Sequence, residues 1–305
     1  MNAQQISRGV VGARSDLRLN QKEWPFGPHI AVTFRAPSTK LGVSECLETQ
    51  AMTLTPPGRS PNREQIKCKD CPLRVNEAFR AFTDEELDFV QTFKSGELVA
   101  DAGTTIFLEG NNSAHLYTVL SGWVFRYKLL QDGRRQILNF GLPGDFFGLQ
   151  SSMFGEMDHS VEALTDVVLC VFPREKVWKL YEHYADLGFD LTWLAAREQF
   201  ILDENLLTVG RRTAIERVAS VLLHLFQRVQ QLGMARGRRV DLPFTQQQLA
   251  DALGLSHVHT NKTIKKLTGD DLISWEPPVL HVKDLQGLAQ VANDEITSLP
   301  VRPFI

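Results

Sequence analysis

Hydrophobic and polar positions alternate differently in successive parts of the chain, and the changes predict where strands and helices lie. Between Leu98 and Phe172, short runs of β-branched and aromatic residues are separated by glycine turns. Asp132-Gly133 stands between two of these runs, which is a typical signal for a tight hairpin. Many short strands with regular turns favour a small antiparallel barrel or jelly roll.

After residue 173 the apolar residues follow a helical period. A spacing that alternates between four and three residues extends over positions 187–208, with polar Glu198 and Asn205 at two positions of its seam. Such a stripe predicts a short coiled coil between two copies of the chain, and a helix packed on its own barrel is the alternative. The other members of the stripe are Leu187, Leu191, Leu194, Ile201 and Thr208.

The stretch that begins at Thr245 predicts two short helices joined by a sharp turn. Thr245 is a good N-cap, and Gln248 completes a capping box. Gly254 can end the first helix because glycine tolerates a positive φ angle. Ser256 is the next N-cap, and the helix after it has polar residues in its first turns. The pattern is typical of a helix-turn-helix whose second helix enters a DNA major groove, although an ordinary helical hairpin also fits it.

The flanks of this motif predict the rest of a small domain. A helical pattern over 211–230 precedes it, and two β-type runs, 272–275 and 279–282, follow it on either side of a Pro-Pro pair. These runs predict a two-stranded wing beside the helix-turn-helix. Fold class α+β follows, with a sheet-rich first part and a helical second part.

Charge is spread unevenly along the chain. Between Arg211 and Lys283 there are eleven Lys and Arg against six Asp and Glu, a balance of +5, while the whole chain has −3 and its remainder therefore −8. A basic segment on an acidic body suits phosphate binding at one end, although a solvated surface can also carry such a balance.

Composition narrows the class of protein. A chain of 305 residues has room for about two domains. It contains no apolar run of about 18 residues and no apolar N-terminal signal region, so we expect neither a membrane span nor secretion. Four cysteines in a chain of this length do not predict a disulfide framework, which favours a reducing, cytoplasmic location.

Residues 1–66 show no sustained period and include a Pro- and Gly-rich run at 56–62. We expect this part to be a disordered N-terminal extension. Met52 is an alternative start for the chain, and a chain that began there would lack Cys46.

Cys68-Lys-Asp-Cys71 follows the extension. Two cysteines at this spacing place two thiols within reach of one metal ion or of each other. Zinc, an iron–sulfur cluster, a redox disulfide and chance all remain open for a single pair.

The order of these parts resembles the CRP/FNR family of transcription regulators from about Cys68 to Val282. The most specific carriers are the runs 143–148 (PGDFFG), 212–217 (RTAIER) and 245–262. The resemblance implies a sensory antiparallel β-roll of the cyclic-nucleotide-binding type (67–180), a dimerisation helix (181–209), a winged helix-turn-helix (210–285) and a tail (286–305). It also implies a homodimer that binds palindromic promoter DNA and works with RNA polymerase.

The cyclic-nucleotide branch of the family holds its ligand with a Glu and with an Arg-Ser pair. The matching positions here are Leu149 and His159-Ser160. Without that Arg the site lacks a bidentate phosphate partner, so cyclic AMP is not the expected ligand.

The oxygen-sensing branch holds a 4Fe–4S cluster on four cysteines. Cys68, Cys71 and Cys170 match three of those positions by resemblance, but the remaining position falls near residue 77. Cys46 or Glu77 is the candidate for the fourth ligand. Redox chemistry of the thiols, zinc at the Cys pair and no cofactor at all remain alternatives, and Cys170 also fits a plain buried strand cysteine.

By the same resemblance, seven residues are expected to contact DNA. Val258 stands where the family often has a Glu that accepts from cytosine, so we expect a half-site that differs from the usual one. Lys262 could donate to guanine and Asn261 to adenine. The base readers are His257, Val258, Asn261 and Lys262, and the phosphate contacts are Thr245, Gln247 and Ser256.

A cupin-like metal enzyme and a ligand-binding module without DNA function are the competing classes. Only His115 and His159 lie in the predicted roll, and the single His-x-His motif, at 257–259, lies at the start of the recognition helix. The sequence therefore offers no histidine set for a metal enzyme, and we expect no catalytic activity.

Overall fold

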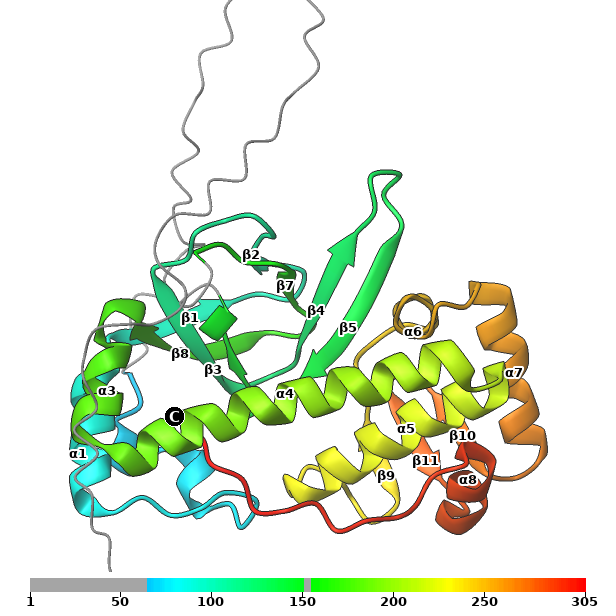
Figure 1. Cartoon of the computed structure of the whole chain (residues 1–305). Coiled ribbons are helices and arrows are strands. Elements are labelled where there is room, and N and C mark those ends of the chain that lie inside the picture. The colour runs from blue at the N-terminus through cyan, green and yellow to red at the C-terminus, as the bar shows by residue number, and fades with distance from the viewer. Residues whose placement is uncertain (1–64, 151–154) are drawn as a thin grey trace, which may run out of the picture. The chain divides into compact units, whose positions relative to one another are not determined.

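The computed structural model describes residues 65–150 and 155–305. The expectations about Cys46, about Met52 and about most of the N-terminal extension fall on residues 1–64, outside the described part. Within it the fold is α+β and contains the expected β-roll, long helix and winged helix-turn-helix (Figure 1). No described helix combines the length and apolar character needed to cross a membrane.

A segment without strands leads into the roll. It contains two short 3-10 helices, η1 (Cys68–Asp70) and η2 (Pro72–Val75), and then helix α1 (Asp84–Phe93). At the start of α1 the Thr83 hydroxyl accepts from the Glu86 N–H, and the Glu86 carboxylate accepts from the Thr83 N–H. This capping box satisfies two N–H groups that a helix start otherwise leaves free.

Two four-stranded antiparallel sheets form the roll. Their strand orders are β1-β8-β3-β6 and β2-β7-β4-β5. Val119 and Leu169 from the first sheet share a buried cluster with Val124 and Val161 from the second, so the core lies between the sheets. The strands are β1 (Gly96–Ala100), β2 (Thr105–Phe107), β3 (His115–Ser121), β4 (Val124–Leu129), β5 (Arg135–Gly141), β6 (Phe146–Phe147), β7 (Ser160–Ala163) and β8 (Val167–Pro173).

Three of these strands, β1, β6 and β7, are not marked by a clear run of β-branched and aromatic residues. Strand β6 has two residues, and Glu97 in β1 and Glu162 in β7 interrupt the apolar pattern. The hairpin predicted at Asp132-Gly133 joins β4 and β5, with Gly133 at φ +84°. That value lies in the left-handed region that glycine adopts without strain.

Two helices follow the roll, α3 (Val177–His183) and α4 (Ala185–Arg211). The predicted dimer stripe is wrong in its first half. Leu187, Leu191 and Leu194 are 0, 1 and 4% exposed and pack in a cluster with residues of α1 and the roll. The apolar stripe thus covers the protein's own core, which was the alternative interpretation of the pattern.

The two polar residues of the stripe, Glu198 and Asn205, also bind the roll of their own chain. Glu198 pairs with Arg126 on β4, and the Asn205 amide donates to the Leu138 carbonyl on β5 at 2.7 Å. Elsewhere on α4, the large apolar residues that are exposed are Phe189, Phe200, Leu206 and Leu207.

The second part of the chain is a winged helix-turn-helix. Its strands form a sheet in the order β10-β11-β9, which confirms the predicted wing. Beyond residue 285, where the sequence predicts a tail, a further helix is followed by a segment that runs back to the roll (Figure 1). The elements are α5 (Ala214–Gln231), β9 (Arg239–Asp241), α6 (Gln246–Leu253), α7 (His257–Gly269), β10 (Ile273–Glu276), β11 (Val279–Val282) and α8 (Leu285–Ala292).

Apolar side chains also join the roll to the helix-turn-helix part. Phe140 on β5 stacks on Phe244, just before α6, with ring centroids 4.6 Å apart. Both belong to one buried cluster that includes the inner face of α5, with Leu222 and Phe226. Helix α5 and strand β5 therefore bury parts of the same apolar cluster. A movement of α5 would change its packing against β5.

Candidate DNA interface and thiol site

Helices α6 and α7 are held by the caps that the sequence predicts. The Thr245 hydroxyl accepts from the Gln248 N–H at 3.1 Å, and the Gln248 side chain accepts from the Thr245 N–H at 2.8 Å. Gly254 ends α6 at φ +62°, and the Ser256 hydroxyl accepts from the His259 N–H at 3.2 Å. The start of α7 is therefore fixed, and a helix start carries partial positive charge.

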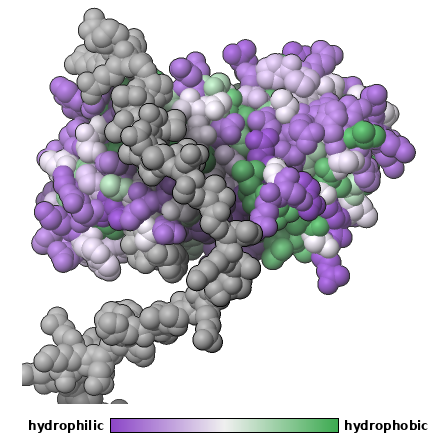
Figure 2. All heavy atoms as spheres, turned by 90° about the horizontal axis from the view of Figure 1, so that it is seen from above, coloured by the Kyte–Doolittle hydropathy of each residue, from purple (hydrophilic) through white to green (hydrophobic). Residues whose placement is uncertain are grey.

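Three of the four predicted base readers are exposed. His257, Val258 and Lys262 lie on the outer side of α7, and Val258 is 78% exposed. Asn261 is half-buried, and its amide donates to the Gln246 side chain at 2.7 Å. In Figure 2 the end of the molecule where Figure 1 shows α7 is mostly hydrophilic, with apolar atoms among the polar ones.

The predicted phosphate contacts are exposed too, but Gln247 already has a partner. Its amide donates to Asp251 at 2.7 Å, and Asp251 also pairs with Arg135 on β5 at 3.0 Å. The neighbouring Gln136 amide donates to the Ala252 carbonyl at 3.0 Å. Strand β5 thus holds α6 in place. Sequence reasoning misses this contact, because 116 residues separate Arg135 from Asp251.

The three cysteines of the described residues lie around one lysine. Cys170 on β8 pairs in register with Glu97 on β1. The charge of Lys94 acts on Cys68, Cys71 and Cys170 alike. The Lys94 side chain is 4% exposed and donates to Glu97 and to the Ile66 carbonyl, both at 2.7 Å. Neither Lys94 nor Glu97 belongs to a motif that the sequence could reveal.

Burial dominates the acidity of these thiols. It raises the pKa of Cys68 and Cys71, and it raises the pKa of Cys170 to about 12, while the positive charge of Lys94 acts in the opposite direction. Neutral thiols are poor nucleophiles and poor metal ligands. A bound cation, or an opening of this region, would be needed to convert them to thiolates.

The geometry does not supply a complete metal site. Within residues 65–150 and 155–305 no three His, Cys, Asp or Glu side chains are grouped closely enough to hold a metal ion, and the three cysteines are free. Glu77, the predicted substitute ligand, is exposed, whereas Glu97 is the carboxylate beside Cys68 and Cys170. The other substitute, Cys46, lies outside the described residues. As arranged, the described side chains therefore do not fit a cluster.

Models of two protein families match this chain. A cyclic nucleotide-binding domain matches residues 97–184, and a Crp-like helix-turn-helix domain matches residues 216–291. The chain is 34% identical to the nitrogen fixation regulation protein FixK of Bradyrhizobium diazoefficiens over 200 residues, which cover 66% of this chain and 83% of that relative. This chain belongs to the CRP/FNR family of transcription regulators.

Other members of the family extend the likeness. The transcriptional activator protein FnrL of Cereibacter sphaeroides is 28% identical over 233 residues, 75% of this chain and 93% of its own. The solved structure of FixK2 from Bradyrhizobium japonicum superposes with a TM-score of 0.59 at 28% identity, covering 66% of this chain and 98% of FixK2. These relatives are regulators, which confirms the expectation of a regulator rather than an enzyme.

The roll of this CRP/FNR-family protein contains a cavity of about 210 Å³. Leu149 and His159, the residues at the family's ligand positions, both line it, together with Arg126 and Glu198. The Arg126 guanidinium pairs with Glu198, and the Ser160 hydroxyl accepts from the Glu109 N–H at 3.0 Å. The Arg126 Nε and the His159 Nε2, by contrast, are buried without a hydrogen-bond partner among the described residues. That cyclic AMP is not the ligand stays a prediction.

Proposed function

We propose that this regulator binds palindromic promoter DNA in the cytoplasm as a homodimer, together with RNA polymerase, and that the redox state of its cysteines controls the binding. The observation that carries the proposal is the exposed start of α7, with His257, Val258 and Lys262 around a capped helix start. In a helix-turn-helix protein these are the positions that reach base edges in the major groove.

The side chains divide into two groups by their chemistry. Lys262 carries a cation that suits guanine O6 and N7, and Val258 can contact only an apolar group such as the thymine methyl. Thr245, Gln247 and Ser256, at the two helix starts, would bind phosphates, for which their hydroxyl and amide groups are suited. Asn261 reads adenine only if its amide leaves Gln246, to which it donates at 2.7 Å.

Selection from random duplexes tests the proposed reading of bases. Wild type should select a palindrome, and His257→Ala and Val258→Ala should each change the preference at one position of the half-site. Thr268→Ala, on an exposed part of α7 beyond the proposed readers, is the control. Failure of wild type to select any sequence, with ordinary folding by circular dichroism, would contradict the DNA part of the proposal.

The exposed face of α4 supports the homodimer. Phe189 and Phe200 are 69 and 63% exposed, and Leu207 is 46% exposed. Spacings of eleven and seven residues bring these three side chains to one face of a helix. A second copy of α4 would bury this face, because two helices with such stripes pack along each other.

Sedimentation of the full chain tests the dimer. Wild type should sediment as a dimer, and Phe200→Glu should produce a monomer, because a buried carboxylate without a partner strongly disfavours the interface. Gln199→Glu, on the neighbouring exposed residue, should leave the dimer intact. Dimers that form equally well with Phe200→Glu would exclude this face.

The arrangement of the thiols supports redox control. Cys170 is far along the sequence from Cys68 and Cys71, yet the charge of Lys94 acts on all three thiols. The soft thiolate is the ligand that iron–sulfur clusters use, and thiols are also the groups that form disulfides. Either chemistry would alter the segment that leads into the roll.

Anaerobic purification separates the two chemistries. Iron and sulfide in the protein, with a visible absorption that air removes, would identify a cluster. A colourless protein whose DNA affinity changes on oxidation would identify thiol chemistry, provided that oxidation no longer changes the affinity in Cys71→Ser. A colourless protein with the same affinity in both states would contradict redox control altogether.

A further inference from the structure

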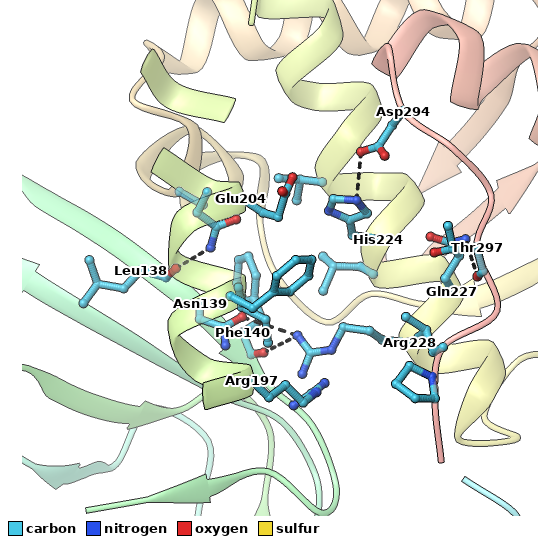
Figure 3. A pocket seen from close by; sticks show the side chains of 18 of the residues that line it. Leu138, Asn139, Phe140, Arg197, Glu204, His224, Gln227, Arg228, Asp294 and Thr297 are labelled. Atoms are coloured by element: carbon cyan, nitrogen blue, oxygen red, sulfur yellow. Dashed lines mark hydrogen bonds and ion pairs between the residues drawn. The ribbon is translucent and has the colours of Figure 1, made fainter. Parts of the chain in front are cut away.

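The segment over residues 294–305, which we call the strap, runs along α5. The Asp294 carboxylate pairs with His224 at 2.9 Å and with Arg212 at 3.2 Å. Farther on, the Gln227 amide donates to the Thr297 carbonyl, as Figure 3 shows beside a cavity of about 600 Å³ that the strap lines. Gln231 donates to the carbonyls of residues 299 and 300 at 3.2 and 2.8 Å.

The far end of the strap is buried in the first part of the chain. Arg302 is 2% exposed and donates to the Pro143 carbonyl at 2.6 Å, and its guanidinium lies 4.7 Å from the centroid of the Phe79 ring. The ring of Phe304 packs on Phe79 and on Phe82, with centroids 5.0 and 4.8 Å apart. The strap is therefore exposed along its middle, whereas its end is buried and hydrogen-bonded and is docked on the first part of the chain.

The carboxylate that binds Arg302 also binds one arginine from each of two helices. Asp145, in the turn before β6, accepts from Arg302 at 2.5 Å, from Arg228 of α5 at 2.5 Å and from Arg197 of α4 at 3.1 Å. Asp145 is 1% exposed. Arg302 and Arg197 share Oδ1 of this carboxylate and Arg228 bonds Oδ2, so the three cations depend on one another through one buried anion. The position of Arg302 is thus coupled to that of Arg228.

The same end of the strap binds the Cys-bearing lead-in. The Arg302 N–H donates to the Ala78 carbonyl at 2.9 Å, and the Arg80 N–H donates to the Arg302 carbonyl at 3.0 Å. The Asn76 amide also donates to the Leu232 carbonyl, at the end of α5. Residues 76–80 follow Cys71 after a single 3-10 turn. A displacement at Cys71 therefore reaches the strap through a short and hydrogen-bonded path.

We propose that the strap transmits changes in the lead-in to α5, and through α5 to the helix-turn-helix. A lead-in that moves at Cys68 and Cys71 pulls residues 78–80 away from Arg302. Asp145 then keeps only Arg197 on Oδ1 and Arg228 on Oδ2, and α5 is free to adopt a second position relative to β5. The nature of the signal rests on the proposed redox control, whereas the mechanical link does not.

Hydrogen exchange of the full chain tests the link without any signal. Arg302→Gln should raise exchange of backbone amides in 76–80 and in α5 by about tenfold, because local opening becomes easier. Gln231→Ala loosens the middle of the strap without touching Asp145 and should raise exchange in 299–302. Val301→Ala, at a residue that is 60% exposed, is the matched control. Unchanged exchange in 76–80 and α5 in both variants overturns the link.

DNA affinity under oxidising and reducing conditions tests the transmission. If wild type responds to the redox state, the response in Arg302→Gln and Gln231→Ala should shrink by about tenfold, as expected for sites that are energetically coupled. An equal response in wild type and in both variants overturns the proposal. If wild type itself does not respond, redox control fails, and the exchange experiment still decides the link.

Discussion

The polar side chains around Asp145 and those at the start of α7 differ in their contact with water. Asp145 and Arg302 are 1 and 2% exposed, and they form an ion pair with each other. His257 and Lys262 on α7 are exposed, and no hydrogen bond ties their side chains to the described residues. Buried charges must be paired within the chain, so they determine how its parts are held. Exposed charges remain available to a partner.

The difference extends to acidity. Burial alone would raise the pKa of Asp145, but the charges of Arg228, Arg302 and Arg197 outweigh it and hold that pKa well below its usual range. Burial lowers the pKa of Arg302 to about 10 although Asp145 opposes the shift. Such shifts measure how strongly a site depends on the folded structure. The Asp145 cluster should therefore govern stability, and α7 should govern recognition.

The largest expected effect is that of Asp145→Asn, which removes the only carboxylate bonded to Arg228 and Arg302 among the described residues. Loss of one partner of a buried ion pair costs about 3–5 kcal/mol of unfolding free energy, because the other charges stay buried. Urea unfolding measures it. Asp132→Asn, at an exposed pair with Arg134, is the control and should cost far less, because water screens exposed charges. Similar losses of unfolding free energy in the two variants would contradict the difference between the buried and the exposed ion pairs.

The next effect is a pH dependence from His159, which is 3% exposed. Burial, aided by the charge of Arg126, lowers its pKa from 6.5 to about 4. Between these values the unfolded chain takes up a proton that the folded chain refuses. Stability is therefore complete above pH about 6.5 and falls as the pH drops toward 4, by about 3 kcal/mol at most. His159→Gln should flatten this part of the stability profile, and an unchanged slope would contradict the assignment.

At the exposed site the expected effect is on recognition alone. Lys262→Ala should lose about 1–3 kcal/mol of discrimination at one base pair, which is the usual value for a side chain that reads guanine, with an unchanged melting temperature. Lys265→Ala, one turn later on an exposed part of α7, should weaken binding equally for all sequences. The competition of matched and mismatched duplexes measures both. A fall in the melting temperature with Lys262→Ala would contradict the assignment of stability to the Asp145 cluster and of recognition to α7.

The smallest effect is expected at Thr245, which is exposed and yet structural. Its hydroxyl caps α6, and Thr245→Ala should cost about 1 kcal/mol of stability in addition to any loss of DNA affinity. Gln247→Ala, at an exposed neighbour without a capping role, should lower affinity at a smaller cost in stability. Thermal unfolding of both variants without DNA separates the two contributions.

The fold followed from local patterns at most places. The capping box at Thr245, the left-handed Gly254 and the Asp132-Gly133 hairpin are all present as the sequence predicts. Each depends on residues within a few positions of one another, so the printed order of residues is sufficient. The roles of the proposed base readers stay predictions.

The stripe on α4 shows where this reasoning reaches its limit. Its period correctly predicts a helix with one apolar face, but Leu187 and Leu191 cover the chain's own core. Periodicity reveals that a face is buried and does not reveal what buries it, because the hydrophobic effect is not directional. The partner of an apolar face becomes visible only when the other elements are in place.

Most helices and strands, the caps and the family were predictable from the order of residues, since these features depend on neighbours along the chain. The folded structure was needed to show that Arg302, 157 residues from Asp145, binds that carboxylate, and that the charge of Lys94 acts on three cysteines. Contacts of this kind join charges that no periodic pattern marks. They form because a folded interior forces buried charges to find partners, wherever in the chain those partners are.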